Sequence, residues 1–162
     1  MSNPGSIEYV HSQNRHSLQS PQAVLPVIFE WGRPASLLDV GCGTGTWSRT
    51  ALDLGVPEVL GLDGVQISKE ELLISDKCFR VQDFTRDWNV GRRFDLALCL
   101  EVGEHLEQGS AAQLVRNLTA HSDRIVFSAA CPGQAGQHHV NCQWPAFCRS
   151  FLTGQVFIAT TA

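Results

Sequence analysis

Hydrophobic positions along this chain follow two patterns, short apolar runs and longer stretches with apolar residues at helical spacing. The short runs predict buried strands, and they lie at residues 36–40, 58–62, 78–82, 94–100 and 124–128. The stretches between them predict helices, which lie at residues 21–31, 46–54 and 67–75 and after Ser110, where Ser110 and Gln113 have the spacing of a capping box. Strands that alternate with helices are typical of an α/β fold with a doubly wound, mostly parallel sheet.

The last part of the chain departs from this alternation. Residues 129–145 are polar and rich in Gly, Gln and His, and we interpret them as a long loop beside the ligand edge of the sheet. A loop of that length is commonly functional or disordered. A turn of helix at residues 146–152 and a short strand at 156–159 are expected to follow.

The first residues predict a flexible segment rather than part of the core. Residues 1–20 are rich in Ser, Asn, Gln and His and carry few apolar side chains, which favours a solvated tail. A length of 162 residues suits one domain, and we place that domain at residues 21–162. The alternative, in which His11 and His16 belong to a lid over a substrate, stays open.

The stretch at residues 36–47 reads SLLDVGCGTGTW. An apolar run ends in Asp39 and then passes into three glycines at alternate positions, Gly41, Gly43 and Gly45. This order predicts a strand, a tight turn and a helix whose first N–H groups face a ligand. Side chains at the glycine positions would keep the backbone away from that ligand. A dinucleotide fingerprint has a different glycine spacing, and the Asp39 carboxylate suits an ammonium group better than a pyrophosphate.

Acidic residues stand at the carboxyl ends of the predicted strands, and these are Asp39, Asp63, Asp83 and Glu101. In doubly wound sheets ligands bind at that edge. Asp63 follows the first glycine by about 20 positions, where a carboxylate accepts hydrogen bonds from the ribose hydroxyls of a nucleoside. The alternative for Asp63 is a turn formed by the Asp63-Gly64 pair.

The segment LLDVGCGTG resembles motif I of the class I S-adenosylmethionine-dependent methyltransferases, and the resemblance extends over roughly residues 21 to 150. It implies a Rossmann-like methyltransferase sheet with S-adenosylmethionine as the cofactor. It further implies that Asp83 meets the adenine amino group and that Phe84 lies against the adenine ring. The family sheet ends in an antiparallel hairpin, which is incomplete in this sequence, so that dimerisation or a further segment would have to compensate.

Methyl transfer needs orientation and, for some acceptors, a base. His105 and His139 are the candidate bases, since histidine titrates near neutral pH. Glu101, Glu104, His105 and His139 also resemble the metal motif of small-RNA terminal 2′-O-methyltransferases and of some quinone O-methyltransferases. The prediction that we favour has no metal, and Glu101 then contacts the methionine part of the cofactor.

The amino-acid composition argues against two kinds of partner, nucleic acids and membranes. The net charge is −4 with no basic block, which argues against broad nucleic-acid binding. No apolar run reaches membrane-spanning length and the first residues lack the apolar core of a signal peptide, so we expect a cytoplasmic protein without membrane contact. The six cysteines contain no metal-binding pair and are expected to be reduced.

Three functions follow from these observations. The first is a methyltransferase that acts on a small-molecule or saccharide-like acceptor, with a homodimer as one way to complete the sheet. The second is a metal-dependent RNA 2′-O-methyltransferase. The third is a truncated, non-catalytic domain that binds the cofactor or a partner chain. The glycine spacing disfavours a nicotinamide-dependent dehydrogenase.

Overall fold

The structure is a computed structural model, and it describes residues 9, 11, 17–144, 146–147 and 155–158. The helices are α1 (Gln19–Phe29), α2 (Thr46–Asp53) and α3 (Ala111–His121), with short 3-10 turns η2 (Asp76–Cys78), η3 (Gly103–His105) and η4 (Gln108–Ser110). The strands are β1 (Ser36–Val40), β2 (Glu58–Asp63), β3 (Phe79–Val81), β4 (Leu96–Leu100), β5 (Arg124–Ser128) and β6 (Gln155–Ile158).

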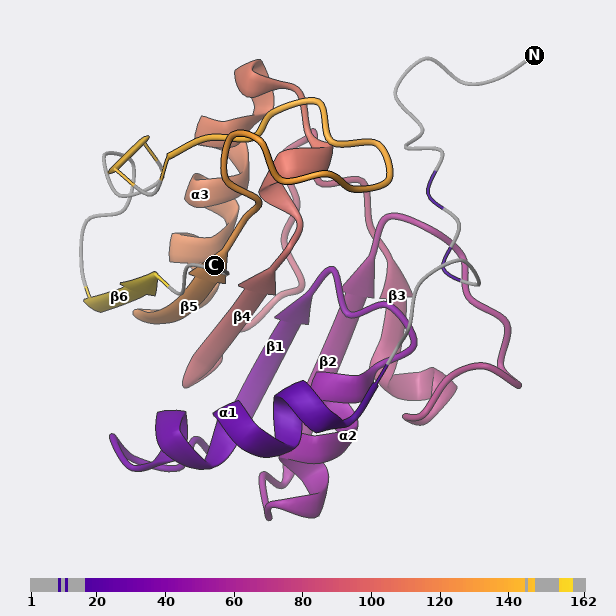
Figure 1. Cartoon of the computed structure of the whole chain (residues 1–162). Coiled ribbons are helices and arrows are strands. Elements are labelled where there is room, and N and C mark those ends of the chain that lie inside the picture. The colour runs from indigo at the N-terminus through magenta and orange to yellow at the C-terminus, as the bar shows by residue number, and fades with distance from the viewer. Residues whose placement is uncertain (1–8, 10, 12–16, 145, 148–154, 159–162) are drawn as a thin grey trace.

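The strands form one six-stranded sheet in the order β3-β2-β1-β4-β5-β6 (Figure 1). Every neighbouring pair is parallel, which confirms the doubly wound, mostly parallel sheet. The strand order reverses between β1 and β4, and the loops that leave these two strands diverge there. A crevice at the carboxyl ends of such strands is where α/β sheets bind ligands.

The sixth strand differs from the hairpin of the resembled family. Among the described residues, β6 pairs in parallel with β5, with Ile125 opposite Val156, and no antiparallel pair is present. The predicted strand at residues 156–159 is therefore confirmed, one residue earlier than expected.

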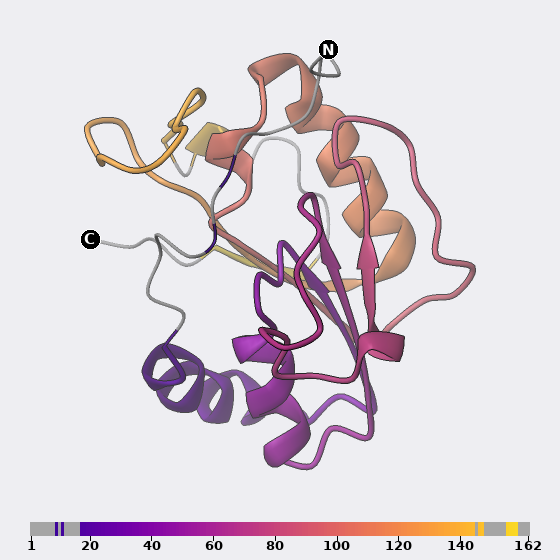
Figure 2. The same ribbon diagram turned by 90° about the vertical axis from the view of Figure 1, so that its right-hand side faces the viewer.

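Helices cover both faces of the sheet, as Figures 1 and 2 show, with α1 and α2 on one face and α3 on the other. Alternate residues of each strand serve the two sides, because successive side chains of a strand point in opposite directions. Leu37 packs in the cluster beneath α1 and α2, whereas Leu38 packs in the cluster beneath α3. All five residues of β1 are buried, as a strand covered on both faces requires.

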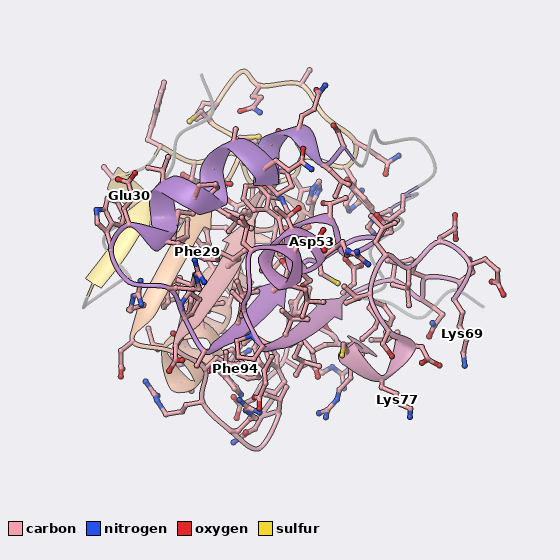
Figure 3. The ribbon with its side chains drawn as sticks, turned by 90° about the horizontal axis from the view of Figure 1, so that it is seen from below. Phe29, Glu30, Asp53, Lys69, Lys77 and Phe94 are labelled. Atoms are coloured by element: carbon pink, nitrogen blue, oxygen red, sulfur yellow. The ribbon has the colours of Figure 1, made fainter. Side chains whose placement is uncertain are left out.

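Figure 3 views the molecule from below and labels Asp53, the last residue of α2, and Phe94, which precedes β4. Asp53, the last residue of α2, lies near the amino ends of the strands. The amino-terminal end of α2 therefore lies toward the carboxyl ends of the strands, as a right-handed crossover requires. The helix that follows the glycines therefore begins at the ligand edge.

Two predictions about local structure are wrong. Residues 67–75 form turns and bends rather than a helix, because tertiary contacts fix this segment: the Leu73 N–H donates to the carbonyl of Thr44 at 2.9 Å, and Ile74 is buried. Ser110 does precede α3, but its side chain makes no cap. Gln113 instead donates to Asp87 and Asn117.

The remaining elements agree with the sequence to within about two residues at each end, apart from the helix turn expected at residues 146–152, of which 148–152 lie outside the described residues. The five cysteines that the structure describes form no disulfide with one another, and the reduced state of the thiols remains a prediction. Within the described ranges, no helix is long and apolar enough to cross a membrane.

Candidate functional site

A cavity of about 600 Å³ opens at the carboxyl ends of β1, β2 and β4. Seven of the ten predicted site residues line it, and they are Asp39, Gly41, Gly43, Asp63, Phe84, Glu101 and His105. Gly45, Asp83 and His139 do not line this cavity. Helix α1 supplies another wall through Ser20, Val24 and Ile28, and Tyr9 and His11 border the cavity as well.

The loop after β1 needs glycine for its backbone conformation at three positions, and at two of them also for packing against side chains of the protein. All three have positive φ angles, at 78° for Gly41, 54° for Gly43 and 86° for Gly45, which favour glycine over other residues. A Cβ atom on Gly41 would lie 2.2 Å from Cγ2 of Val102, and one on Gly45 would lie 3.1 Å from Ile74. The expectation that every glycine makes room for a ligand is therefore corrected: at these two positions the protein's own side chains fill the space.

Asp39 ties the end of β1 to the start of α2. Its Oδ2 accepts hydrogen bonds from the Ser48 backbone N–H at 3.1 Å and from the Ser48 hydroxyl at 2.8 Å. The residue is buried, and this burial raises the pKa of the Asp39 carboxyl from 3.8 to about 6, against the lowering effect of Ser48. The carboxylate thus fixes the helix start and also brings negative charge to the cavity wall.

Asp63, at the end of β2, is held by the glycine loop and by its own turn. The backbone N–H of Gly43 donates to Oδ2 at 2.8 Å, and that of Val65 donates to Oδ1 at 2.9 Å. Nε2 of His11 lies 3.1 Å from the same Oδ1. The side chain is buried yet faces the cavity, so it is a preorganised acceptor for hydroxyl groups.

Asp83 and Phe84 separate in the structure. Asp83 is exposed, accepts hydrogen bonds from the N–H and the hydroxyl of Thr85, and pairs with Arg86 at 3.1 Å. Phe84 is buried in the core cluster beneath α3 and reaches the cavity wall. The role of Asp83 toward an adenine amino group remains a prediction, as does stacking by Phe84.

Glu101 follows β4 with φ at 56°, a left-handed conformation that non-glycine residues rarely adopt. Its backbone N–H donates to the carbonyl of Ser128 at 3.0 Å, and its Oε1 accepts from the Ser128 hydroxyl at 2.7 Å. The two bonds tie the loop after β4 to the end of β5. Backbone strain of this kind is typical of functional loops.

His105 lies at the end of η3 and faces the cavity. Its Nδ1 lies 3.3 Å from the carbonyl oxygen of His138, a contact in which Nδ1–H donates, so Nε2 carries a lone pair. Burial lowers the pKa of His105 from its ordinary value. A neutral imidazole with a free lone pair is equipped to accept a proton near neutral pH.

Glu104 is the least ordinary side chain in this region. It is fully buried, and neither carboxylate oxygen has a hydrogen-bond partner among the described residues. Burial raises the pKa of Glu104 from 4.5 to about 8, and the neighbouring charge of Glu101 acts in the same direction. A buried polar group without a partner is costly and calls for an explanation.

His139 joins this group from the long loop after β5, residues 129–144, which is called the late loop below. Ligand atoms of Glu104, His105 and His139 all lie within 4.8 Å of one another. The Glu104 carbonyl accepts from the N–H groups of Val140 and Asn141, at 2.9 and 3.1 Å, which anchors the loop beside η3. The three side chains therefore form a compact cluster at the side of the cavity, and His105 is the one of the three that lines it.

Gly136 makes room for the His139 ring. A Cβ atom at this glycine would lie 2.1 Å from Nε2 of His139, closer than any real contact. Nδ1 of His139 lies 3.1 Å from the carbonyl of Gln134, a contact in which Nδ1–H donates. The loop thus sets both the position and the tautomer of the ring.

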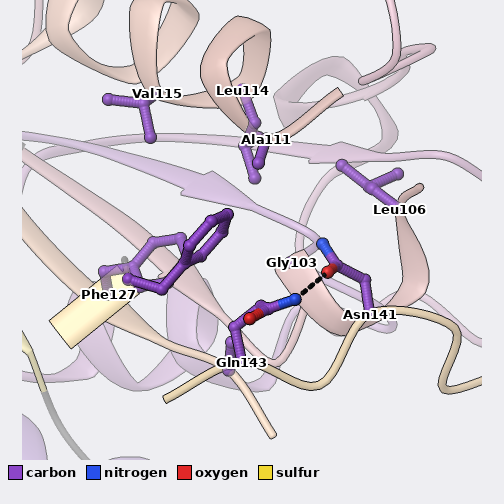
Figure 4. A pocket seen from close by; sticks show the side chains of 10 residues that line it. Gly103, Leu106, Ala111, Leu114, Val115, Phe127, Asn141 and Gln143 are labelled. Carbon is purple, nitrogen blue, oxygen red and sulfur yellow. Dashed lines mark hydrogen bonds between the residues drawn. The ribbon is translucent and has the colours of Figure 1, made fainter. Parts of the chain in front are cut away.

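A second, much smaller pocket lies between η3 and α3 (Figure 4). Its volume is about 30 Å³, which admits a water molecule but no substrate group of useful size. Leu106, Leu114 and Phe127 line it, and Gln143 donates to Asn141 at 2.9 Å at its side. This pocket is a packing gap beneath the late loop.

Three site features differ from the predictions that the sequence favoured: His11 borders the cavity, as only the alternative of a lid allowed, whereas His16 lies outside the described residues. Tyr9 and His11 fall in the segment expected to be a solvated tail, yet both border the cavity. The burial of Glu104 is the third feature. The only available signals were the order Glu-His before the late loop and the two aromatic rings in an otherwise polar stretch.

Comparison with known proteins agrees with this geometry. A family model described as a methyltransferase domain matches residues 11–149. No protein of curated function matches the sequence. Each solved structure named below is less than 25% identical to this chain and shows the fold alone.

The sugar N-methyltransferase KedS8 from Streptoalloteichus sp. ATCC 53650 is 21% identical, with a TM-score of 0.55 over 76% of this chain and 53% of that one. The amino pentose methyltransferase CalS10 from Micromonospora echinaspora, solved with S-adenosylmethionine bound, is 24% identical, with a TM-score of 0.54 over 65% and 47%. The methyltransferase domain of the bacterial CtHen1-CN is 16% identical, with a TM-score of 0.52 over 65% and 62%. This chain spans about half the length of the first two proteins.

The family match covers most of the chain, and the parallel sheet with its glycine loop and acidic rim agrees with it. The chain belongs to the methyltransferase domain family, among the class I S-adenosylmethionine-dependent methyltransferases.

Proposed function

We propose that this protein transfers a methyl group from S-adenosylmethionine to a hydroxyl or amino group of a small-molecule or saccharide-like acceptor. The observation that carries the proposal is one cavity lined both by the glycine loop with Asp63 and by the neutral His105. Groups that would bind the cofactor and a side chain that would accept a proton thus line the same cavity. KedS8 is a sugar N-methyltransferase and CalS10 an amino pentose methyltransferase, and both neighbours favour an acceptor of this class.

The residues present fit this cofactor. The Asp63 carboxylate, preset by Gly43 and Val65, would accept hydrogen bonds from the ribose hydroxyls. Asp39 and Glu101 would place negative charge beside the ammonium group of the methionine part. When bound, S-adenosylmethionine supplies an electrophilic methyl group on its sulfonium sulfur.

His105 would take the proton that the acceptor loses. Its Nδ1–H is engaged by the carbonyl of His138, so that Nε2 is the accepting atom. Such a base contributes about 10²- to 10⁴-fold to a rate. Most of the remaining acceleration would come from holding the two reactants in line.

Thermal unfolding tests the cofactor assignment. S-adenosylhomocysteine at about 100 times its dissociation constant should stabilise the protein by about 2.7 kcal/mol, a rise of several degrees in Tm. NAD should give no rise, and the reverse ranking would contradict the proposal. Transfer of a labelled methyl group to a panel of amino and hydroxy sugars then tests catalysis, and binding without any transfer would favour a non-catalytic cofactor-binding domain.

A second candidate function, metal-assisted O-methylation, is favoured by the cluster of Glu104, His105 and His139. A divalent cation would neutralise the buried Glu104 carboxylate, whose two oxygens lack partners among the described residues. One carboxylate with two imidazoles suits ions such as Mn²⁺, Fe²⁺ or Zn²⁺ better than Mg²⁺. When bound, the ion would lower the pKa of an acceptor hydroxyl, such as a ribose 2′-hydroxyl of RNA, and Glu104, His105 and His139 would hold it.

Metal binding can be tested without an activity assay. Mn²⁺ should raise the Tm of the protein, and the Glu104→Gln variant should lose that rise because it removes the ligand charge. Gly136→Ala should lose it as well, since the new methyl group would displace the His139 ring. Gly109→Ala is the matched control, because a Cβ atom there meets nothing within 4 Å and the glycine has no positive φ.

The same variants distinguish the two candidates. If EDTA leaves methyl transfer unchanged and Mn²⁺ gives no rise in Tm, the metal-assisted function is excluded.

Without a metal, the raised pKa of Glu104 means that the folded state binds a proton more tightly than the unfolded chain. The free energy of unfolding should then fall as the pH rises from about 5 to about 8, and Glu104→Gln should flatten that decline.

A further inference from the structure

His11 occupies part of the site that the proposed nucleoside needs. Its Nε2 lies 3.1 Å from Oδ1 of Asp63, and 13% of its side chain and 7% of that of Asp63 are exposed. The ring packs edge-on against Tyr9, with centroids 4.9 Å apart, and Tyr9 packs in the same way against His105, also at 4.9 Å. A chain of three rings therefore crosses the cavity from the acid at the end of β2 to the candidate base.

The hydrogen-bonding capacity of Asp63 shows what this contact costs. An ionised carboxylate offers about four lone-pair positions, two on each oxygen. The Val65 N–H and His11 both approach Oδ1, while the Gly43 N–H approaches Oδ2. A ribose diol donates two hydrogen bonds, but Oδ2 has one position left and Oδ1 has none. The two backbone bonds belong to the fold, so His11 is the contact that can give way.

We propose that His11 stands in for one ribose hydroxyl at Asp63 and must leave Asp63 before a nucleoside with both hydroxyls can bind. The inference rests on the proposed function, since it assumes that Asp63 receives a ribose. His11 is then a residue that sets cofactor affinity, and it acts by competition rather than by contact with the reacting atoms. The Tyr9 ring connects the exchange at Asp63 to His105.

Calorimetric titration of three proteins (the natural chain, His11→Ala and His11→Gln) with three ligands tests this competition. His11→Ala should bind adenosine and S-adenosylhomocysteine about three- to tenfold more tightly than the natural chain, the range expected for removal of one competing hydrogen bond. His11→Gln keeps a donor at the side-chain end and should stay close to the natural affinity. For 2′,3′-dideoxyadenosine, which has no ribose diol, His11→Ala should give no gain.

Each other outcome has a distinct meaning. Equal or weaker adenosine binding by His11→Ala would overturn the competition, and weaker binding would place His11 among the cofactor contacts. An equal gain for the dideoxy compound would also overturn it, because the cavity would then simply have become more open. Absence of binding of both S-adenosylhomocysteine and adenosine by all three proteins would contradict the proposed function itself, since a competitor worth about tenfold cannot hide a site.

Discussion

Replacing Asp63 with asparagine is expected to weaken the binding of S-adenosylhomocysteine about a hundredfold. The change removes the charge that would receive both ribose hydroxyls, and hydrogen bonds to a charged group contribute about 1.5–3 kcal/mol each. Asparagine keeps the size of the side chain and one acceptor for Gly43 or Val65, so the turn should survive. Isothermal titration calorimetry measures the affinity, and circular dichroism checks the fold.

Asp53→Asn is the matched control for this prediction. Asp53 is exposed at the end of α2 and pairs with Arg49 at 3.0 Å, far along the helix from the cavity. It should bind the ligand as the natural chain does. If Asp63→Asn also kept the natural affinity, the proposed ribose contact would be wrong, and the Asp-Gly pair would be a turn and nothing more.

The second large effect concerns His105. His105→Gln should lower kcat for methyl transfer about 10²- to 10⁴-fold, the usual contribution of a general base, with little change in the affinity for S-adenosylhomocysteine. Burial lowers the pKa of His105, so the natural enzyme should stay active to a pH below the ordinary histidine value of 6.5. The acidic limb of its pH profile should disappear in the variant.

His138→Asn serves as the control, because its side chain is exposed and asparagine tolerates the φ of 54° found there. The variant keeps the backbone carbonyl that accepts from His105. Full activity of His105→Gln would contradict its role as the base. A variant that also loses cofactor affinity would show that His105 holds the cofactor rather than the acceptor proton.

Short-range signals were enough to predict the frame of the fold and most of the cavity rim. The runs at β1 and β5 have the bounds that their apolar patterns predict, because strands buried on both faces are continuous apolar segments. Asp39, Asp63 and Glu101 then follow from topology, since parallel strands bring their carboxyl ends to one edge. To predict where each of these acids lies, it is enough to recognise the strand and its carboxyl end.

Long-range contacts explain what the sequence could not predict. His11 meets Asp63 across 52 positions of the chain, and a polar segment gives no local sign of such a contact. The helix expected at residues 67–75 does not form, because Ile74 fills the space left by Gly45 and Leu73 bonds to Thr44. The burial of Glu104 likewise depends on the late loop, whose N–H groups at Val140 and Asn141 bind the Glu104 carbonyl.

The fit of Val102 against Gly41 has a consequence for the order of events in turnover. One side chain from the loop after β4 sits where the glycine turn has no Cβ atom, and His105 lies only three residues further on. A rearrangement of the turn on cofactor binding would therefore displace Val102 and with it the segment that carries His105, the proposed base. We expect a compulsory kinetic sequence, in which the methyl donor enters first and the acceptor finds its pocket assembled only afterwards.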